Sequence, residues 1–132
     1  MSESIIRRKS EAFSVRIIKL SRYLKSTKHE NVISIQIYRS GTSVSANVNE
    51  ALQGSSKNDF ANKMNIALKE AAETKHWLRL LYESDYLTNK EFDSIYEDAS
   101  EIEKILTSIV KTTRYNIESE RMEKRRGVNK EN

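Results

Sequence analysis

Apolar side chains recur every three to four residues in four stretches of the chain, the spacing that places them on one side of an α-helix. The first three stretches predict helices over residues 10–25, 28–53 and 57–82. The fourth has the most regular heptad spacing, begins after Thr88 and loses its apolar period beyond Tyr115. The residues expected to form the core are Phe13, Ile17, Leu20, Leu24, Ile33, Ile37, Val44, Val48, Leu52, Phe60, Met64, Ala67, Ala71, Thr74, Leu78, Leu81, Phe92, Ile95, Ala99, Ile102, Leu106, Ile109 and Thr113.

Residues at the expected helix starts support these boundaries. Thr27-Lys-His-Glu30 and Thr88-Asn-Lys-Glu91 have capping-box spacing, and Ser56 precedes the third helix with Asp59 in its first turn. The chain contains no proline and only three glycines, which favours long helices. Because short connections place successive helices side by side and antiparallel, the sequence predicts an all-α, up-down-up-down four-helix bundle over residues 10–115.

The second helix contains an exception, a small and polar stretch between Arg39 and Ala51. Its polar residues at one helical face are Arg39, Ser43, Asn47 and Glu50. Gly41 is unfavourable inside a helix by up to about 1 kcal/mol relative to alanine, so packing must favour it here. Small residues let two helices approach closely, and polar groups that become buried need partners.

This polar face has two interpretations. In the structural one, it forms a layer at a helix–helix or subunit contact, and Arg39 pairs with a carboxylate such as Glu70 or Glu73. Loss of Arg39 would then cost the roughly 3–5 kcal/mol typical of breaking a buried ion pair. In the functional one, the same face contacts a ligand or RNA.

The stretch Arg39-Ser-Gly-Thr-Ser-Val-Ser-Ala-Asn-Val-Asn-Glu-Ala51, followed by Ser-Ser-Lys-Asn-Asp-Phe60, resembles a family of four-helix-bundle proteins encoded by intervening sequences in bacterial large-subunit ribosomal RNA genes. The resemblance covers about residues 10–113, and Ala51 stands where that family usually has glycine. It implies an antiparallel four-helix bundle, a ring-shaped homopentamer and a role in nucleic-acid binding, with no known reaction.

Apolar and small residues outside the core stripes provide a physical reason to expect subunit contacts, because a monomer would leave them in water. These residues are Val15, Ile18, Ile35, Ala46, Ile66 and Trp77. The subunit number comes from the resemblance alone.

Charge is distributed unevenly along the chain, although the net charge is only +4. Residues 1–28 contain eight Lys/Arg and two Glu, and residues 111–126 contain six Lys/Arg and three Glu. Residues 83–103 contain eight Asp/Glu and one Lys. Basic ends can offer a surface to polyanions, whereas the alternative is a solvated surface of mixed charge.

We expect residues 1–9 to form a loose basic arm and residues 116–132 to form a flexible basic tail. In an antiparallel bundle both emerge at the same end, so their charges would add. The expected RNA contacts are Arg7, Arg8, Lys9, Arg16, Lys19, Arg22, Arg121, Lys124, Arg125 and Arg126. Base selectivity should be poor, because no RNA-recognition, KH or helix-turn-helix signature is present.

Catalytic and metal-binding motifs are not convincing. Glu73-x-x-His76 has the spacing of di-iron bundles, but those need two such motifs, and the second histidine, His29, has Ser26 three residues before it. Two histidines give no basis for a Ser-His-Asp arrangement, and no glycine-rich phosphate loop exists. We therefore expect no catalytic residue, no metal, no cofactor and no enzymatic activity.

The sequence also bounds the compartment. It lacks cysteine, has no apolar run near the ~20 residues that span a bilayer, and shows no signal-peptide apolar region. A cytoplasmic protein is expected.

Two functions fit these observations. The first is a non-enzymatic, oligomeric protein that binds RNA. The second is a scaffold that docks a protein partner, similar to the accessory proteins of diversity-generating retroelements, which share the bundle and ring architecture and assist a reverse transcriptase.

Overall fold

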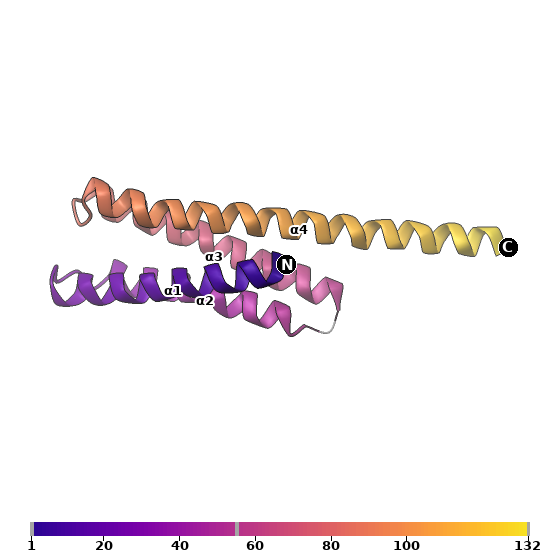
Figure 1. The fold of residues 1–132 in the computed structure, drawn as a ribbon, viewed down its shortest axis with the longest axis horizontal. Helices are drawn as coiled ribbons and strands as arrows, with labels where there is room; N and C mark the ends of the chain where they lie inside the picture. The colour runs from indigo at the N-terminus through magenta and orange to yellow at the C-terminus, as the bar shows by residue number, and fades with distance from the viewer. Residues whose placement is uncertain (1, 55, 132) are drawn as a thin grey trace.

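The computed structural model describes residues 2–54 and 56–131, and it describes side chains for residues 5–54 and 56–128. The described residues form four helices and no strand (Figure 1). The helices are α1 (Ser2–Ser26), α2 (Ile33–Leu52), α3 (Lys57–Glu83) and α4 (Asn89–Glu131). The all-α prediction is confirmed. Each helix packs on the next one along the chain, and α1 also meets α4, through fewer residues than the other pairs.

Contacts between α1 and α2 join late residues of one helix to early residues of the other. Ser21 Oγ lies 2.8 Å from Ser34 O, whereas Ser14 Oγ lies 2.8 Å from Gly41 O. Figure 1 shows the same reversal at each connection, so that every helix runs back beside the one before it.

The core lies between the four helices and contains most of the predicted stripe. The buried apolar side chains are Ile6, Phe13, Ile17, Leu24, Ile37, Val44, Val48, Ala51, Ala61, Met64, Ala67, Ala71, Leu78, Leu81, Leu87, Ile95, Ala99, Ile102, Leu106 and Val110. The predicted core residues that are only partly buried against this cluster include Leu20, Ile33, Leu52, Phe60, Phe92 and Ile109.

The N-terminal segment differs from the prediction. α1 begins at Ser2, so residues 2–9 are helical and the expected loose arm is wrong; Met1 lies outside the described residues. Ile6 lies seven residues before Phe13, on the same side of the helix, and both side chains are buried in the core. Burial of one more large apolar side chain holds these first turns against the bundle.

The start of α2 also differs from the prediction, because Thr27 does not cap it. α2 begins at Ile33, and His29 adopts a left-handed φ of 55° in the connection. The Glu30 carboxylate accepts hydrogen bonds from three backbone N–H groups, at 3.1 Å from Val32, 3.0 Å from Ile33 and 2.6 Å from Ser34. Glu30 was predicted to lie inside the first turn of the second helix. It instead precedes α2 and caps the N-terminus of that helix.

Electrostatics at this cap favour the charged carboxylate. Burial is the largest influence on Glu30 and raises its pKa, but the hydrogen bonds from Ile33, Ser34 and Val32 together outweigh it. The pKa of Glu30 consequently lies below its ordinary value.

The other two predicted helix starts are confirmed. Ser56 Oγ accepts from the Asp59 N–H at 3.0 Å. Thr88 and Glu91 form a reciprocal capping box, in which the Thr88 N–H donates to Glu91 Oε1 at 2.9 Å and the Glu91 N–H donates to Thr88 Oγ1 at 3.2 Å.

The C-terminal end of α4 is longer than predicted. The helix continues beyond Tyr115 to Glu131 and extends past the rest of the bundle (Figure 1). Glu120 forms an ion pair with Lys57 at the first turn of α3. Residues 121–131, which we call the α4 overhang, therefore extend about 16 Å beyond this last contact with the bundle. The basic tail is a helix in the described residues, and not an irregular segment.

Candidate functional site

The small residues of α2 bring it close to α1. Ser14 Oγ hydrogen-bonds both the Gly41 carbonyl oxygen at 2.8 Å and Ser45 Oγ at 2.7 Å. A Cβ atom added at Gly41 would lie 2.5 Å from Cγ2 and 2.9 Å from Cβ of Ile17. This contact explains why glycine and serines occupy a helix interior, and it confirms the expected close approach.

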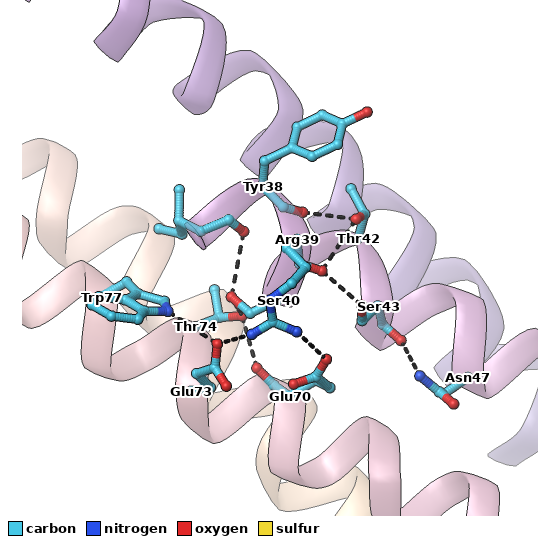
Figure 2. Close-up of polar contacts among 11 residues, drawn as sticks. Tyr38, Arg39, Ser40, Thr42, Ser43, Asn47, Glu70, Glu73, Thr74 and Trp77 are labelled. Carbon is cyan, nitrogen blue, oxygen red and sulfur yellow. Dashed lines mark hydrogen bonds and ion pairs between the residues drawn. The ribbon is translucent and has the colours of Figure 1, made fainter. Parts of the chain in front are cut away.

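Arg39 bridges α2 to α3 through two carboxylates. Figure 2 shows its guanidinium lying between Glu70 and Glu73, with Arg39 Nη1 3.0 Å from Glu70 Oε2 and Nη2 paired with Glu73 Oε2. Trp77 Nε1 also donates to Glu73 Oε2, at 3.1 Å. Below this cluster, buried Thr74 donates to Ser40 Oγ at 2.9 Å. The predicted pairing of Arg39 is present, with both suggested partners.

The Arg39 pairs are not buried, which differs from the expectation. The side chains of Arg39, Glu70 and Glu73 are 49%, 17% and 36% exposed. Partial burial lowers the pKa of Arg39, but the two carboxylates raise it by more, so its pKa lies above its ordinary value. Water screens such pairs in the isolated chain, so about 1 kcal/mol is the appropriate scale there, below the roughly 3–5 kcal/mol typical of breaking a buried pair.

The remaining residues of the predicted polar face have local partners. Ser43 Oγ donates to the Arg39 carbonyl at 2.7 Å, and Asn47 Nδ2 donates to the Ser43 carbonyl at 2.8 Å (Figure 2). Glu50 lies 2.8 Å from Lys63 Nζ of α3. Every charged group of the face is therefore paired within the chain, and the face presents no free charge to an anionic ligand.

The basic residues predicted on α1 divide into two groups. Lys9 pairs with Glu101 at 2.7 Å and Arg16 with Asp98 at 2.6 Å, both across the contact with α4. Arg7 lies 3.8 Å from Glu11 on its own helix. The members without an ion pair in the described residues are Arg8, Lys19 and Arg22, and all three are exposed. Carboxylates of the same chain thus neutralise half of the basic residues predicted on α1.

The basic residues predicted at the C-terminus lie on the α4 overhang. Arg121 lies 3.9 Å from Glu118, whereas Lys124, Arg125 and Arg126 are exposed and form no ion pair among the described residues. Lys9 of α1 sits beside Glu101, twenty residues before Arg121. At 1.5 Å per residue this separation is about 30 Å along α4, so Lys9 does not adjoin the basic residues of the overhang.

Sequence reasoning missed a group of lysines between α3 and α4. A groove of about 770 Å³ lies there and is lined by Leu68, Lys69, Ala72, Glu103, Lys104, Thr107, Ser108 and Lys111. The seven-residue spacing of Lys104 and Lys111 was a visible signal that they share a face of one helix. Lys69 could be joined to them only by knowing how α3 packs on α4.

The described residues contain neither a group of metal ligands nor a membrane-spanning helix. Among the described side chains, no three of the His, Asp and Glu groups lie close enough to hold a metal ion. Glu73, half of the Glu-x-x-His spacing, is bound by Arg39 and Trp77, and the His76 ring lies 5.1 Å from that of Trp77. Within the described parts, each helix is too short or too polar to cross a membrane.

Known proteins are similar to most of this chain. A family model described as 23S rRNA-intervening sequence protein matches residues 2–108. Among solved structures, the chain is similar to a protein with unknown function from the S23 ribosomal protein family of Bacteroides thetaiotaomicron VPI-5482. The two share 49% sequence identity with a TM-score of 0.83 over 84% of this chain and 99% of that chain. No curated protein matches the chain.

Proposed function

Since the chain belongs to the family of 23S rRNA-intervening sequence proteins, we propose that it is a non-enzymatic protein that binds RNA. Its protomer is an antiparallel up-down-up-down bundle, and its assembly is a closed homo-oligomeric ring, a pentamer. The observation that carries the proposal is the α4 overhang, which extends beyond the bundle. Its exposed residues include four cations and one acidic residue, Glu123; the cations are Arg121, Lys124, Arg125 and Arg126. An exposed cationic helix of this kind attracts a polyanion.

Exposed apolar side chains on α1 and α2 support the ring. Val15, Ile35 and Tyr38 are 49%, 52% and 47% exposed, and a shallow hollow lined in part by Ile18 lies between the two helices. Contact with another subunit would remove these side chains from water, at about 25 cal/mol per Å² of apolar area. Trp77, in contrast, is already half-buried against the core and contributes less than the sequence implied.

Light scattering after size exclusion at micromolar concentration tests the assembly. The expected mass is five times the 15.3 kDa of one chain. Ile35→Glu should lower this mass, because it places a charge in the contact, whereas Leu80→Glu, at a 39% exposed position on α3, should not. A monodisperse 15.3 kDa species for the unaltered protein would refute the ring.

Fluorescence anisotropy with a labelled single-stranded RNA across salt concentrations tests the binding. Each phosphate contact on a single strand should contribute about −0.7 to the slope of log affinity against log salt. Deletion of residues 121–132, which removes five basic and two acidic residues, should weaken binding and flatten the slope. A control in which Lys25, Lys28 and Lys90 are changed to Gln has the same net charge and should change the slope less.

The outcome separates this function from the alternative. Absence of binding to RNA at 50 mM salt, or binding that ignores salt, would refute the proposal. It would instead favour a scaffold that docks a protein partner, such as a reverse transcriptase.

A further inference from the structure

The groove between α3 and α4 gathers cations without matching carboxylates. Lys69 on α3 and Lys104 and Lys111 on α4 line it, and none forms an ion pair among the described residues. The single carboxylate in the lining, Glu103, is bound by Lys75 at 2.8 Å. Three free ammonium groups therefore face one concave surface with no internal counter-ion in the described residues.

This arrangement contrasts with the other contacts between helices. Lys9 pairs with Glu101 between α1 and α4, and Lys63 pairs with Glu50 between α2 and α3. Cations that line one groove without ion pairs give it a positive potential, which attracts a polyanion. The lining also includes small and hydroxyl-bearing residues, Ala72, Thr107 and Ser108, which leave room for a polymer backbone.

The basic face continues along α4 beyond the groove. From Lys111, spacings of three, four, three and four residues lead through Arg114, Glu118 and Arg121 to Arg125, which keeps them on one side of the helix. Glu118 interrupts the row but lies 3.9 Å from Arg121. The distance from Lys104 to Arg125 is 21 residues, or about 31 Å along the helix.

An aromatic ring is exposed beside this row. Tyr115 follows Arg114, lies four residues after Lys111, and is 73% exposed, the highest value for a large apolar side chain in the described residues. An exposed ring next to phosphate-binding cations is the combination that proteins use to hold single-stranded nucleic acids, because every base can stack on it.

We propose that the α3–α4 groove and the α4 face from Lys111 to Arg125 form one binding track for single-stranded RNA. Lys69, Lys104 and Lys111 contact consecutive parts of the phosphate backbone, and Tyr115 stacks on an unpaired base. This assignment rests on the proposed function, and it locates the RNA on the face formed by α3 and α4. The exposed apolar residues of α1 and α2 are left for the subunit contact.

The groove is tested with two matched triple variants, Lys69→Gln/Lys104→Gln/Lys111→Gln and Lys19→Gln/Arg22→Gln/Lys25→Gln. Each removes three exposed positive charges, the first from the groove and the second from α1. Three lost contacts at about 0.7 each should reduce the salt slope by about 2, which corresponds to about 100-fold weaker binding of a labelled 20-nucleotide RNA at 0.1 M salt. The α1 variant should lose less than about fivefold.

Stacking is tested separately with Tyr115→Leu and Tyr115→Phe. Loss of one stacked base corresponds to about 5- to 150-fold in affinity, without a change in the salt slope. Tyr115→Phe should retain affinity because its ring stacks equally well. A duplex RNA of the same length offers no unpaired base, so its binding should not respond to Tyr115→Leu.

The possible results are distinguishable. If the unaltered protein binds no RNA, the proposed function fails, and the track fails with it. If the protein binds RNA but both triple variants lose affinity equally, RNA binding stands and the groove assignment is wrong. If Tyr115→Leu binds like the unaltered protein, or Tyr115→Phe loses as much as Tyr115→Leu, the stacking contact is wrong. Circular dichroism melting of each variant checks that these exposed substitutions leave the fold intact.

Discussion

Replacing Gly41 with alanine tests how closely α1 and α2 approach. The added Cβ would lie 2.5 Å from Cγ2, 2.8 Å from Cγ1 and 2.9 Å from Cβ of Ile17. Ile17 is fully buried, and its branched side chain has one strongly preferred rotamer in a helix, so it cannot turn away. The two helices must therefore move apart.

The expected change is the difference between two terms. Overpacking of this kind costs about 1–3 kcal/mol, and three contacts below 3.0 Å favour the upper part of that range. Alanine gains about 1 kcal/mol over glycine in a helix interior. Gly41→Ala should thus lower the free energy of unfolding by about 1–2 kcal/mol.

Gly127→Ala is the matched control, because an added Cβ there meets nothing within 4 Å in the overhang of α4. It should be neutral or slightly stabilising. Urea denaturation followed by circular dichroism, at one protein concentration, measures both variants.

A double-mutant cycle with Ile17→Ala isolates the contact. Ile17→Ala alone should cost about 2–5 kcal/mol, and it should cost less when Gly41 is already alanine, since the smaller side chain leaves room for the new methyl group. A Gly41→Ala variant as stable as the unaltered protein, or costs that simply add, would show that α1 and α2 are not held at this distance by glycine.

Two further predictions concern the charged groups that join the helices. Glu30→Gln should lower the unfolding free energy by about 1–2 kcal/mol at pH 7, because it removes the charge from the cap of α2. The pKa of Glu30 is lower in the folded protein, so its stabilisation is present above the unfolded value of about 4.3 and is lost as the pH falls through the folded pKa. Denaturation at several pH values should show the difference between the two proteins narrowing below about pH 4, and a constant difference would contradict the cap. Arg39→Ala should cost only about 1 kcal/mol, less at 1 M salt, since Arg39 is half-exposed and its partners Glu70 and Glu73 are partly exposed. A loss above about 3 kcal/mol in the same assay would mean that the pairs are buried, for example by another subunit.

Helix number and core-facing sides followed from the sequence because they depend on local periodicity. Phe13, Ile17 and Leu24 repeat at helical spacing, and burial of that stripe needs no knowledge of its partners. The predicted first helix began at Ser10, because the charged residues 7–9 separate it from Ile6, which continues the apolar stripe. Thr27 and Glu30 had capping-box spacing, yet only the path of the connection decided that Glu30 caps the next helix.

Contacts between helices were harder to predict because they depend on register. The sequence indicated that Arg39 would meet Glu70 or Glu73, because these residues lie beside the core-facing stripes of two consecutive helices. It could not indicate that Lys9 and Arg16 are neutralised by Glu101 and Asp98, because those pairs depend on how far α1 slides along α4.

The sequence by itself determined an all-α bundle and a chain with basic ends, because both depend on which residues occur and at what spacing. Only the tertiary structure decided which cations remain free. Packing pairs Lys9 and Arg16 with carboxylates of α4 and leaves Lys69, Lys104 and Lys111 in one groove without an ion pair among the described residues. The physical reason is that an ion pair needs two groups within about 4 Å, and that distance is fixed by the packing of helices and not by their order in the chain.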